Sequence, residues 1–305
     1  MDALSNVLSW LKPQTFVSAG LNAGGQWAIQ FPVHGGIKFN AVIKGSCFLQ
    51  VEGDAQTYTL QAGDCFLLTT GRRFILANDL SIKKIPSETI YDNVVHNTAV
   101  CNNGGTFFLI GARFHFDAAH TRFLFGQLPP VVVVPQDKDQ AAVLRWGLER
   151  FKTEFESDMP GKNIIMEHLA PIMLMQTLRV YLSNATKTQS GWLAALAEPE
   201  LRLALEAMHM QPEQKWTVAA LGTIAGMSRS GFALKFKQVI GLPPMEYLTQ
   251  WRIMIAREQL KAGNRNLYQI ASSLGYESES AFSIVFKRFV GCSPKSFAKH
   301  SLEEQ

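Results

Sequence analysis

The side chains best suited to bind a ligand lie in two clusters near the C-terminus, about 50 residues apart. Lys235 and Lys237 in the first cluster, and Lys287 and Arg288 in the second, are placed to neutralise phosphates. The other members offer hydrogen bonds or apolar contacts of the kind that read base edges. They are Arg229, Ser230, Ala233 and Leu234 in the first cluster, and Glu279, Ser280, Ser283 and Ile284 in the second. This combination is typical of a surface that contacts double-stranded DNA.

Each cluster lies on the second helix of a predicted helix-turn-helix. In both copies a short apolar helix ends at a glycine, Gly226 or Gly275, because glycine tolerates the left-handed conformation that closes a helix. A serine follows, Ser228 or Ser278, which can N-cap the next helix. One such pattern is weak evidence and is more typical of an ordinary helical hairpin, whereas two copies favour DNA binding.

A long helix is predicted between the two copies, from Met245 to Leu260, because apolar residues recur at helical spacing. Such a helix would hold the two recognition helices at a fixed separation. Successive major grooves on one face of a duplex lie roughly 34 Å apart. One chain could therefore read two successive grooves.

The last 100 residues or so resemble the DNA-binding domain of the AraC/XylS family of bacterial transcription regulators. The resemblance is carried by GMSRSGFALKFKQVIGLPPMEYLTQWRIMIAREQL and IASSLGYESESAFSIVFKRFVGCSPKSFAK. It implies binding to promoter DNA and contact with RNA polymerase, and activation is the commoner role in the family. Leu234 and Ile284 depart from the family pattern, since relatives often carry a long polar or basic side chain at these positions. We therefore expect more readout of DNA shape and of thymine methyl groups.

Composition and charge agree with a DNA-binding C-terminal region. The chain has 305 residues, 47% hydrophobic and 18% charged, with a net charge of +4. From residue 211 onward there are 12 Lys and Arg against 7 Asp and Glu, so the positive charge lies at the C-terminal end. No apolar run is long enough to span a membrane, and no export signal is visible. A cytoplasmic protein with reduced thiols fits best.

The region from about residue 15 to residue 135 predicts many short strands. Runs of β-forming residues alternate with turns such as Gly35-Gly36, Glu52-Gly53-Asp54 and Ala62-Gly63-Asp64, a spacing typical of an antiparallel sandwich or barrel. AVIKGSCFLQVEG and YTLQAGDCFLLTTG resemble the double-stranded β-helix of the cupin type, here as the sensor domain of one AraC subgroup. Together the two resemblances cover nearly the whole chain.

A catalytic cupin would need a metal held by two or three histidines and a glutamate. Where a His-x-His pair would lie, this sequence reads Lys38-Phe39-Asn40. We therefore expect no metal, no cofactor and no enzyme activity, and a barrel interior able to hold a small effector. The candidate effector-binding residues are Phe39, Val42, Phe48, Phe66 and Phe108, with Arg72 and Arg73 at the mouth. Each apolar residue is more commonly core than ligand contact, and the arginines could equally be solvated turn charges.

Oxidation of a thiol is an alternative input. Cys47 and Cys65 lie in apolar strand patterns, where an inert buried thiol is usual. Cys101 precedes Asn102-Asn103-Gly104-Gly105, which predicts an exposed turn, so Cys101 is the candidate redox residue.

Two helices are predicted after the strands, over residues 140–155 and 164–182. The second is rich in methionine and leucine over a wide arc, which favours a homodimer interface over packing within one chain. The polar segment 182–190 is interpreted as a linker. It separates a cupin-like sensor and dimerisation domain, 1–190, with its helical part at about 136–190, from a DNA-binding domain, 191–305.

The sequence thus predicts an α+β multidomain chain. A cupin-like β-barrel with a helical dimerisation segment precedes an all-α domain with two helix-turn-helix motifs. The function predicted is sequence-specific transcription regulation, with a small effector or dimerisation as the input. A thiol-based redox regulator, or a metal-dependent cupin enzyme fused to a DNA-binding domain, are the alternatives.

Overall fold

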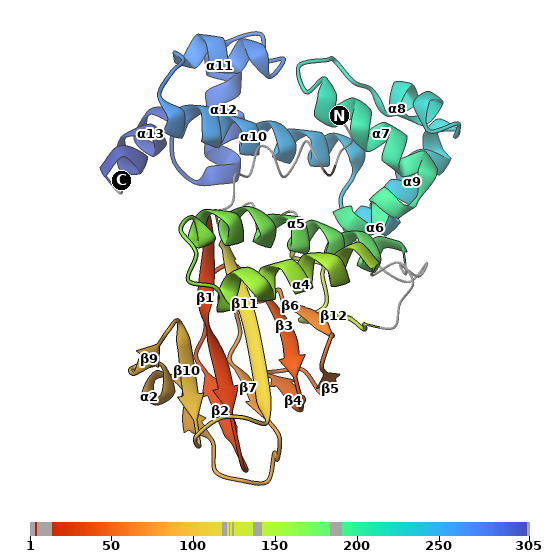
Figure 1. Cartoon of the computed structure of the whole chain (residues 1–305). Helices are drawn as coiled ribbons and strands as arrows, with labels where there is room; N and C mark the ends of the chain where they lie inside the picture. The colour runs from red at the N-terminus through yellow and green to blue at the C-terminus, as the bar shows by residue number, and fades with distance from the viewer. Residues whose placement is uncertain are drawn as a thin grey trace. The chain divides into compact units, whose positions relative to one another are not determined.

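Figure 1 shows a computed structural model of the chain. It describes residues 4, 14–117, 121, 123, 125–136, 142–183 and 191–303. These residues form two compact units, one within Pro13–Ala185 and the other within Met1–Lys12 together with Thr186–Gln305. The linker predicted at 182–190 falls mostly on residues 184–190, which lie outside the described residues.

The first unit is built on two β-sheets whose inner faces share one hydrophobic core. Within the described residues, the larger sheet has seven strands in the order β12-β6-β3-β11-β1-β10-β9. These strands are β1 (Gln14–Ala23), β3 (Ile37–Lys44), β6 (Cys65–Leu68), β9 (Val94–Val95), β10 (Thr98–Cys101), β11 (Phe107–His115) and β12 (Val131–Val134). Most neighbours are antiparallel, but β1 pairs in parallel with β10.

The smaller sheet has five described strands in the order β5-β4-β7-β2-β8. They are β2 (Ala28–Phe31), β4 (Ser46–Val51), β5 (Thr57–Gln61), β7 (Phe74–Ala77) and β8 (Ile85–Pro86), and the short helix α2 (Ser87–Tyr91) follows β8. Alternate residues of the strands point inward, as the period of two requires. Cys47, Leu49 and Val51 of β4 therefore enter the core, together with Trp27 and Phe66 from other segments.

Two antiparallel helices complete this unit, as Figure 1 shows. They are α4 (Ala142–Glu156) and α5 (Lys162–Ser183), close to the predicted ranges. α5 packs on β1, β6 and β12, which places the helices against the larger sheet. The edge-to-face contact of Phe108 with Phe155, at 6.0 Å between ring centroids, lies in this layer.

The second unit is helical throughout its described elements. They are α6 (Trp192–Ala197), α7 (Pro199–Met210), α8 (Val218–Ile224), α9 (Arg229–Ile240), α10 (Pro244–Ala262), α11 (Leu267–Ser273), α12 (Glu279–Val290) and α13 (Pro294–Glu303). Helices α8–α9 and α11–α12 are the two helix-turn-helix motifs, and α10 joins them. The predicted fold class, a cupin-like β domain followed by a helical domain with two such motifs, is confirmed.

The two turns close in the same way. Gly226 and Gly275 both have positive φ, 64° and 78°. In each turn, a backbone N–H beyond the first helix donates a hydrogen bond back to a carbonyl of that helix. Met227 donates to the carbonyl of Gly222 at 2.8 Å, and Tyr276 donates to the carbonyl of Ala271 at 3.0 Å. Ser228 and Ser278 then N-cap α9 and α12. These local bonds fix the angle at which each second helix leaves its turn.

Candidate nucleic-acid interface and sensor cavity

Helices α9 and α12 are the equivalent second helices of the two helix-turn-helix motifs. Each has 12 residues, and they begin 50 positions apart. Phe232 and Phe236 anchor α9 in its motif, and Phe282 and Phe286 occupy the same positions in α12. The opposite faces of the two helices are consequently exposed at equivalent positions.

Most of the predicted DNA-contacting side chains lie on these exposed faces. Those that are exposed are Arg229, Ser230, Leu234, Lys237, Glu279, Ser280, Ile284, Lys287 and Arg288, while Ala233 and Ser283 are half-buried. Leu234 is 61% exposed and Ile284 is 73% exposed, and they occupy the same position in the two copies. An aliphatic side chain this exposed contributes little to the fold. Single exposed aliphatic residues are normal on protein surfaces, so the matching positions of this pair, and not its exposure, distinguish it.

Lys235 differs from the other basic residues on these helices. Its Nζ lies 2.9 Å from a carboxylate oxygen of Glu198 and 3.4 Å from one of Glu200, at the start of α7. Hydrogen bonding to Glu198 raises the pKa of Lys235. The prediction that Lys235 is free to neutralise phosphate is therefore not supported by its placement. Helical spacing could not show this, because the carboxylates come from a segment more than 30 residues earlier.

The segment before α8 links the two motifs through contacts that the sequence pattern did not reveal. Arg252 of α10 donates to the carbonyls of Pro212 at 2.6 Å and Gln214 at 2.9 Å. Its guanidinium carbon also lies 5.7 Å from the ring centroid of Tyr276, in the second turn. Lys215 pairs with Glu277 at 2.7 Å. This segment therefore ties the first motif to the turn of the second.

A buried aromatic cluster supports the first motif. The ring of His209 stacks on Trp251 at 4.0 Å between centroids, and its Nε2 lies 2.8 Å from the Tyr247 hydroxyl. Burial lowers the pKa of His209 to about 3, so the imidazole is neutral at pH 7. The cluster packs α7 against α10.

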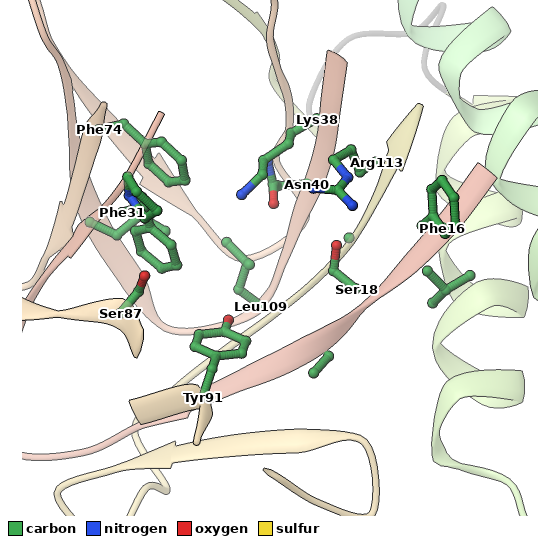
Figure 2. A pocket seen from close by; sticks show the side chains of 15 residues that line it. Phe16, Ser18, Phe31, Lys38, Asn40, Phe74, Ser87, Tyr91, Leu109 and Arg113 are labelled. Atoms are coloured by element: carbon green, nitrogen blue, oxygen red, sulfur yellow. The ribbon is translucent and has the colours of Figure 1, made fainter. Parts of the chain in front are cut away.

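The first unit contains a cavity of about 330 Å³ between its sheets. It is lined by β1, β2, β3, β7, β11 and α2, and Figure 2 shows the side chains that point into it. The apolar part includes Phe31, Phe74, Leu76 and Leu109. The polar part comprises Ser18, Lys38, Asn40, Ser87, Tyr91 and Arg113.

Several predicted effector-binding residues lie elsewhere. Phe39 alternates with Lys38 and Asn40, which line the cavity, so Phe39 faces away from it. Phe108 packs on Phe155 of α4, outside the core. Phe48 lies on the face of β4 opposite Cys47, Leu49 and Val51. The prediction that these three phenylalanines face the barrel interior is wrong, because both faces of β3, β4 and β11 carry apolar residues.

The other predicted residues divide between core and surface. Val42 and Phe66 face the interior but are fully buried members of the core, and neither lines the cavity. Arg72 and Arg73 are exposed and do not line the cavity. Arg72 instead donates to the carbonyl of Glu52 at 3.3 Å. The cations at the cavity are Lys38 and Arg113, which are not among the predicted residues. The register of β3 on β11 places them side by side, and the alternation along either strand alone does not show this.

The electrostatics of the cavity are those of a positive site. Burial and the neighbouring Arg113 lower the pKa of Lys38 to about 8. Burial and the charge of Lys38 lower the pKa of nearby His34 to about 4. Both ring nitrogens of His34 are buried without a hydrogen-bond partner, and so is Nδ2 of Asn40.

The exposed turn predicted after Cys101 is present at Asn102 and Asn103, but the expectation that it leaves the Cys101 thiol accessible is wrong. Cys101 is the last residue of β10, pairs with Ala23 of β1 and is only 1% exposed. Burial raises its pKa, and burial raises the pKa of Cys47 to about 12. All four cysteines are unpaired thiols. A buried thiol with a raised pKa is a poor nucleophile, so the placement does not favour Cys101 as a sensor.

Within the ranges given above, no group of three or more His, Cys, Asp or Glu side chains is placed to hold a metal ion. The described helices also include none with the length and hydropathy of a membrane span.

Comparison with known proteins agrees with both units. A family model described as cupin matches residues 2–183, and one described as a helix-turn-helix domain matches residues 221–300. An AraC-like transcription regulator of Streptomyces lividans is 42% identical over 98% of this chain and 99% of its own. One of Streptomyces antibioticus is 41% identical over 99% and 100%. The HTH-type transcriptional regulator AlkR of Acinetobacter baylyi is 30% identical over 99% and 100%.

A cupin domain followed by paired helix-turn-helix motifs defines a DNA-binding transcription regulator with an added N-terminal domain. Since the similarity covers almost the full length of the relatives, the chain belongs to the AraC-like transcription regulators.

Proposed function

We propose that this regulator binds double-stranded promoter DNA with α9 and α12 in successive major grooves. Residues 191–305 form the DNA-binding domain in this proposal. The observation that carries it is the equivalence of the two helices, each anchored by two buried phenylalanines and exposed at matching positions. Arg229, Ser230, Glu279, Ser280 and Ser283 read base edges, Ala233, Leu234 and Ile284 contact thymine methyls, and Lys237, Lys287 and Arg288 hold phosphates.

Residues 1–190 form the sensor in this proposal, which responds to a small effector in the cytoplasm and has no catalytic role. The cavity of about 330 Å³ is the observation that supports an effector site. The response changes how the protein engages its promoter and RNA polymerase, with activation as the expected outcome. Such a switch requires an effector that binds two states of the protein with different affinity.

We also propose that α4 and α5 pair with a second copy of the chain. Beside their buried residues, these helices expose Val143 (51%), Trp146 (63%), Ile164 (62%) and Ile172 (46%). Apolar residues this exposed on one helical layer are typical of a protein interface. The mass of the full chain in solution, compared between wild type and Trp146→Glu, tests this proposal, which fails if the wild type is monomeric.

Lys237 and Lys235 provide a matched test of the DNA-binding proposal, since they lie two residues apart on α9. Lys237 is exposed, and no described residue forms an ion pair with it. Lys235 is held by Glu198 and Glu200. Lys237→Met should weaken binding to every DNA sequence and reduce the slope of log affinity against log salt by about one.

Lys235→Met is the control, and its salt slope should match that of the wild type. Equal slopes for all three proteins would contradict the assignment of Lys237 to a phosphate. A lower slope for both variants would show that Lys235 also reaches the DNA backbone.

A further inference from the structure

We propose that the sensor cavity binds an organic monoanion, a carboxylate carried on an apolar body. Lys38 and Arg113 hold the carboxylate, and the body lies against Phe31, Phe74 and Leu109. This inference rests on the proposed effector-sensing function and specifies its ligand class.

The cation pair is the first observation behind this proposal. Lys38 on β3 and Arg113 on β11 are direct cross-strand partners, so two positive charges stand side by side on the inner face of the sheet. Like charges directly opposite in a sheet are destabilising. Lys38 is half-buried, and its pKa is lowered to about 8, which reports the unfavourable surroundings of its charge.

No acidic residue compensates these charges. None of the residues that line the cavity is Asp or Glu. Among the described residues, neither Lys38 nor Arg113 has a carboxylate within ion-pair distance. The nearest stabilising contacts are aromatic: Nζ of Lys38 lies 5.1 Å from the ring centroid of Phe74, and Arg113 lies 5.5 Å from that of Phe16. A bound anion would supply the missing counter-charge.

A buried donor lies beside the two cations. Nδ2 of Asn40 has no hydrogen-bond partner, and the residue is only 9% exposed. In Figure 2 its amide lies between Lys38 and Arg113. Leaving a buried amide donor unsatisfied costs free energy, which a ligand oxygen would recover. Three donors thus converge on one part of the cavity, and the planar guanidinium of Arg113 suits the two oxygens of a carboxylate.

The apolar lining of the cavity fits an organic ligand better than a small inorganic anion. Phe31 and Phe74 stack at 4.5 Å with an interplanar angle of 2°, and Leu76 and Leu109 continue this apolar surface. A cavity of about 330 Å³ is within the range of small-molecule sites. A phosphate ion would leave the apolar wall in contact with water, whereas an apolar body would cover it.

Isothermal titration calorimetry on the full chain tests this assignment. The probes are 4-phenylbutyrate and decanoate as acids, 4-phenylbutyramide as the neutral analogue, and inorganic phosphate. At least one acid should bind at least tenfold more tightly than the amide and phosphate. Lys38→Met should weaken binding of that acid at least tenfold and leave the amide unchanged.

Lys44→Met is the matched control, since Lys44 lies on the same strand but donates to the carbonyl of Gly105 at the surface. It should bind the acid as the wild type does. Lys38→Met should also melt at no lower temperature than the wild type, because it removes one of two adjacent like charges. Loss of the fold is thereby distinguished from loss of the site.

The proposal is overturned if neither acid binds, if acid and amide bind equally, if phosphate binds more tightly, or if Lys44→Met weakens binding as much as Lys38→Met. Titrating the same ligand-free preparations with promoter DNA distinguishes failure of the ligand proposal from failure of the proposed DNA-binding function. Intact DNA binding in Lys38→Met would leave the regulator assignment standing, and loss of DNA binding by the wild type would contradict the regulator assignment itself.

Discussion

Replacing Ile284 by alanine should weaken binding to the target site by about 5- to 30-fold. Burying a branched aliphatic side chain contributes about 1.5–3 kcal/mol. Ile284 is 73% exposed in the protein alone, so contact with DNA can bury about three quarters of its side chain. That burial would contribute about 1–2 kcal/mol to the free energy of binding. The fold should not change, because an exposed side chain contributes little to stability.

A thymine-to-uracil scan of the site identifies the partner, since uracil lacks only the methyl group. At one thymine, uracil should weaken wild-type binding by about fourfold, as expected for one buried carbon. The same substitution should have no effect on Ile284→Ala. Leu203→Ala is the control, an aliphatic side chain 47% exposed on α7, which is not a recognition helix. If uracil is harmless at every thymine while Ile284→Ala still weakens binding, methyl readout by Ile284 is refuted.

Two further predictions concern the support of the recognition helices. Arg252→Met should weaken binding about tenfold to DNA that carries the contact blocks of both recognition helices, and should leave binding to DNA with one block nearly unaffected. The reason is that Arg252 ties the segment at Pro212 and Gln214 to the second turn. Equal losses on both DNAs in a gel titration would contradict this role. His209 has a pKa of about 3 in the folded protein, below its unfolded value of 6.5. Its contribution to the free energy of unfolding is therefore complete above pH 6.5 and falls by about 1.4 kcal/mol per pH unit on acidification towards pH 3. Urea unfolding of His209→Gln should show a shallower loss of stability between pH 6.5 and 5 than the wild type, and an unchanged pH slope would contradict this. The exposed His168→Gln is its control.

The helix-turn-helix motifs could be predicted from sequence because their determinants are local. Gly226 and Gly275 close the turns with positive φ, and Ser228 and Ser278 cap the next helices through bonds to residues three positions on. Aromatic anchors at helical spacing then identify the buried face. None of these features requires knowledge of a distant segment.

The cavity could be predicted only in part, because a strand pattern does not reveal which face is inside when both faces are apolar. In β3, Phe39 points away from the sheet interior and Val42 points into it, yet both side chains are fully buried. Hydrophobicity alone therefore could not show which face of the strand is inside. Lys38 and Arg113 had the pattern of solvated residues. Only the cross-strand register shows that they meet on the inner face.

For two other predicted residues, a segment distant in the sequence determines the environment of the side chain. Cys101 precedes a real turn, but its own position pairs with Ala23, almost 80 residues earlier, and this strand pairing buries the thiol. Lys235 has the spacing of a DNA contact, but Glu198 and Glu200 reach it from the start of α7. Sequence periodicity describes a residue's own helix or strand and not the elements that pack on it.

The central claim is that both recognition helices read DNA from one chain. The most direct measurement is to sequence genomic fragments captured by the purified full-length protein, with and without reductant. We predict one motif with two blocks about one helical turn apart, unchanged by reductant because Cys101 is buried. A motif with a single block, or one that appears under only one redox condition, would contradict the account.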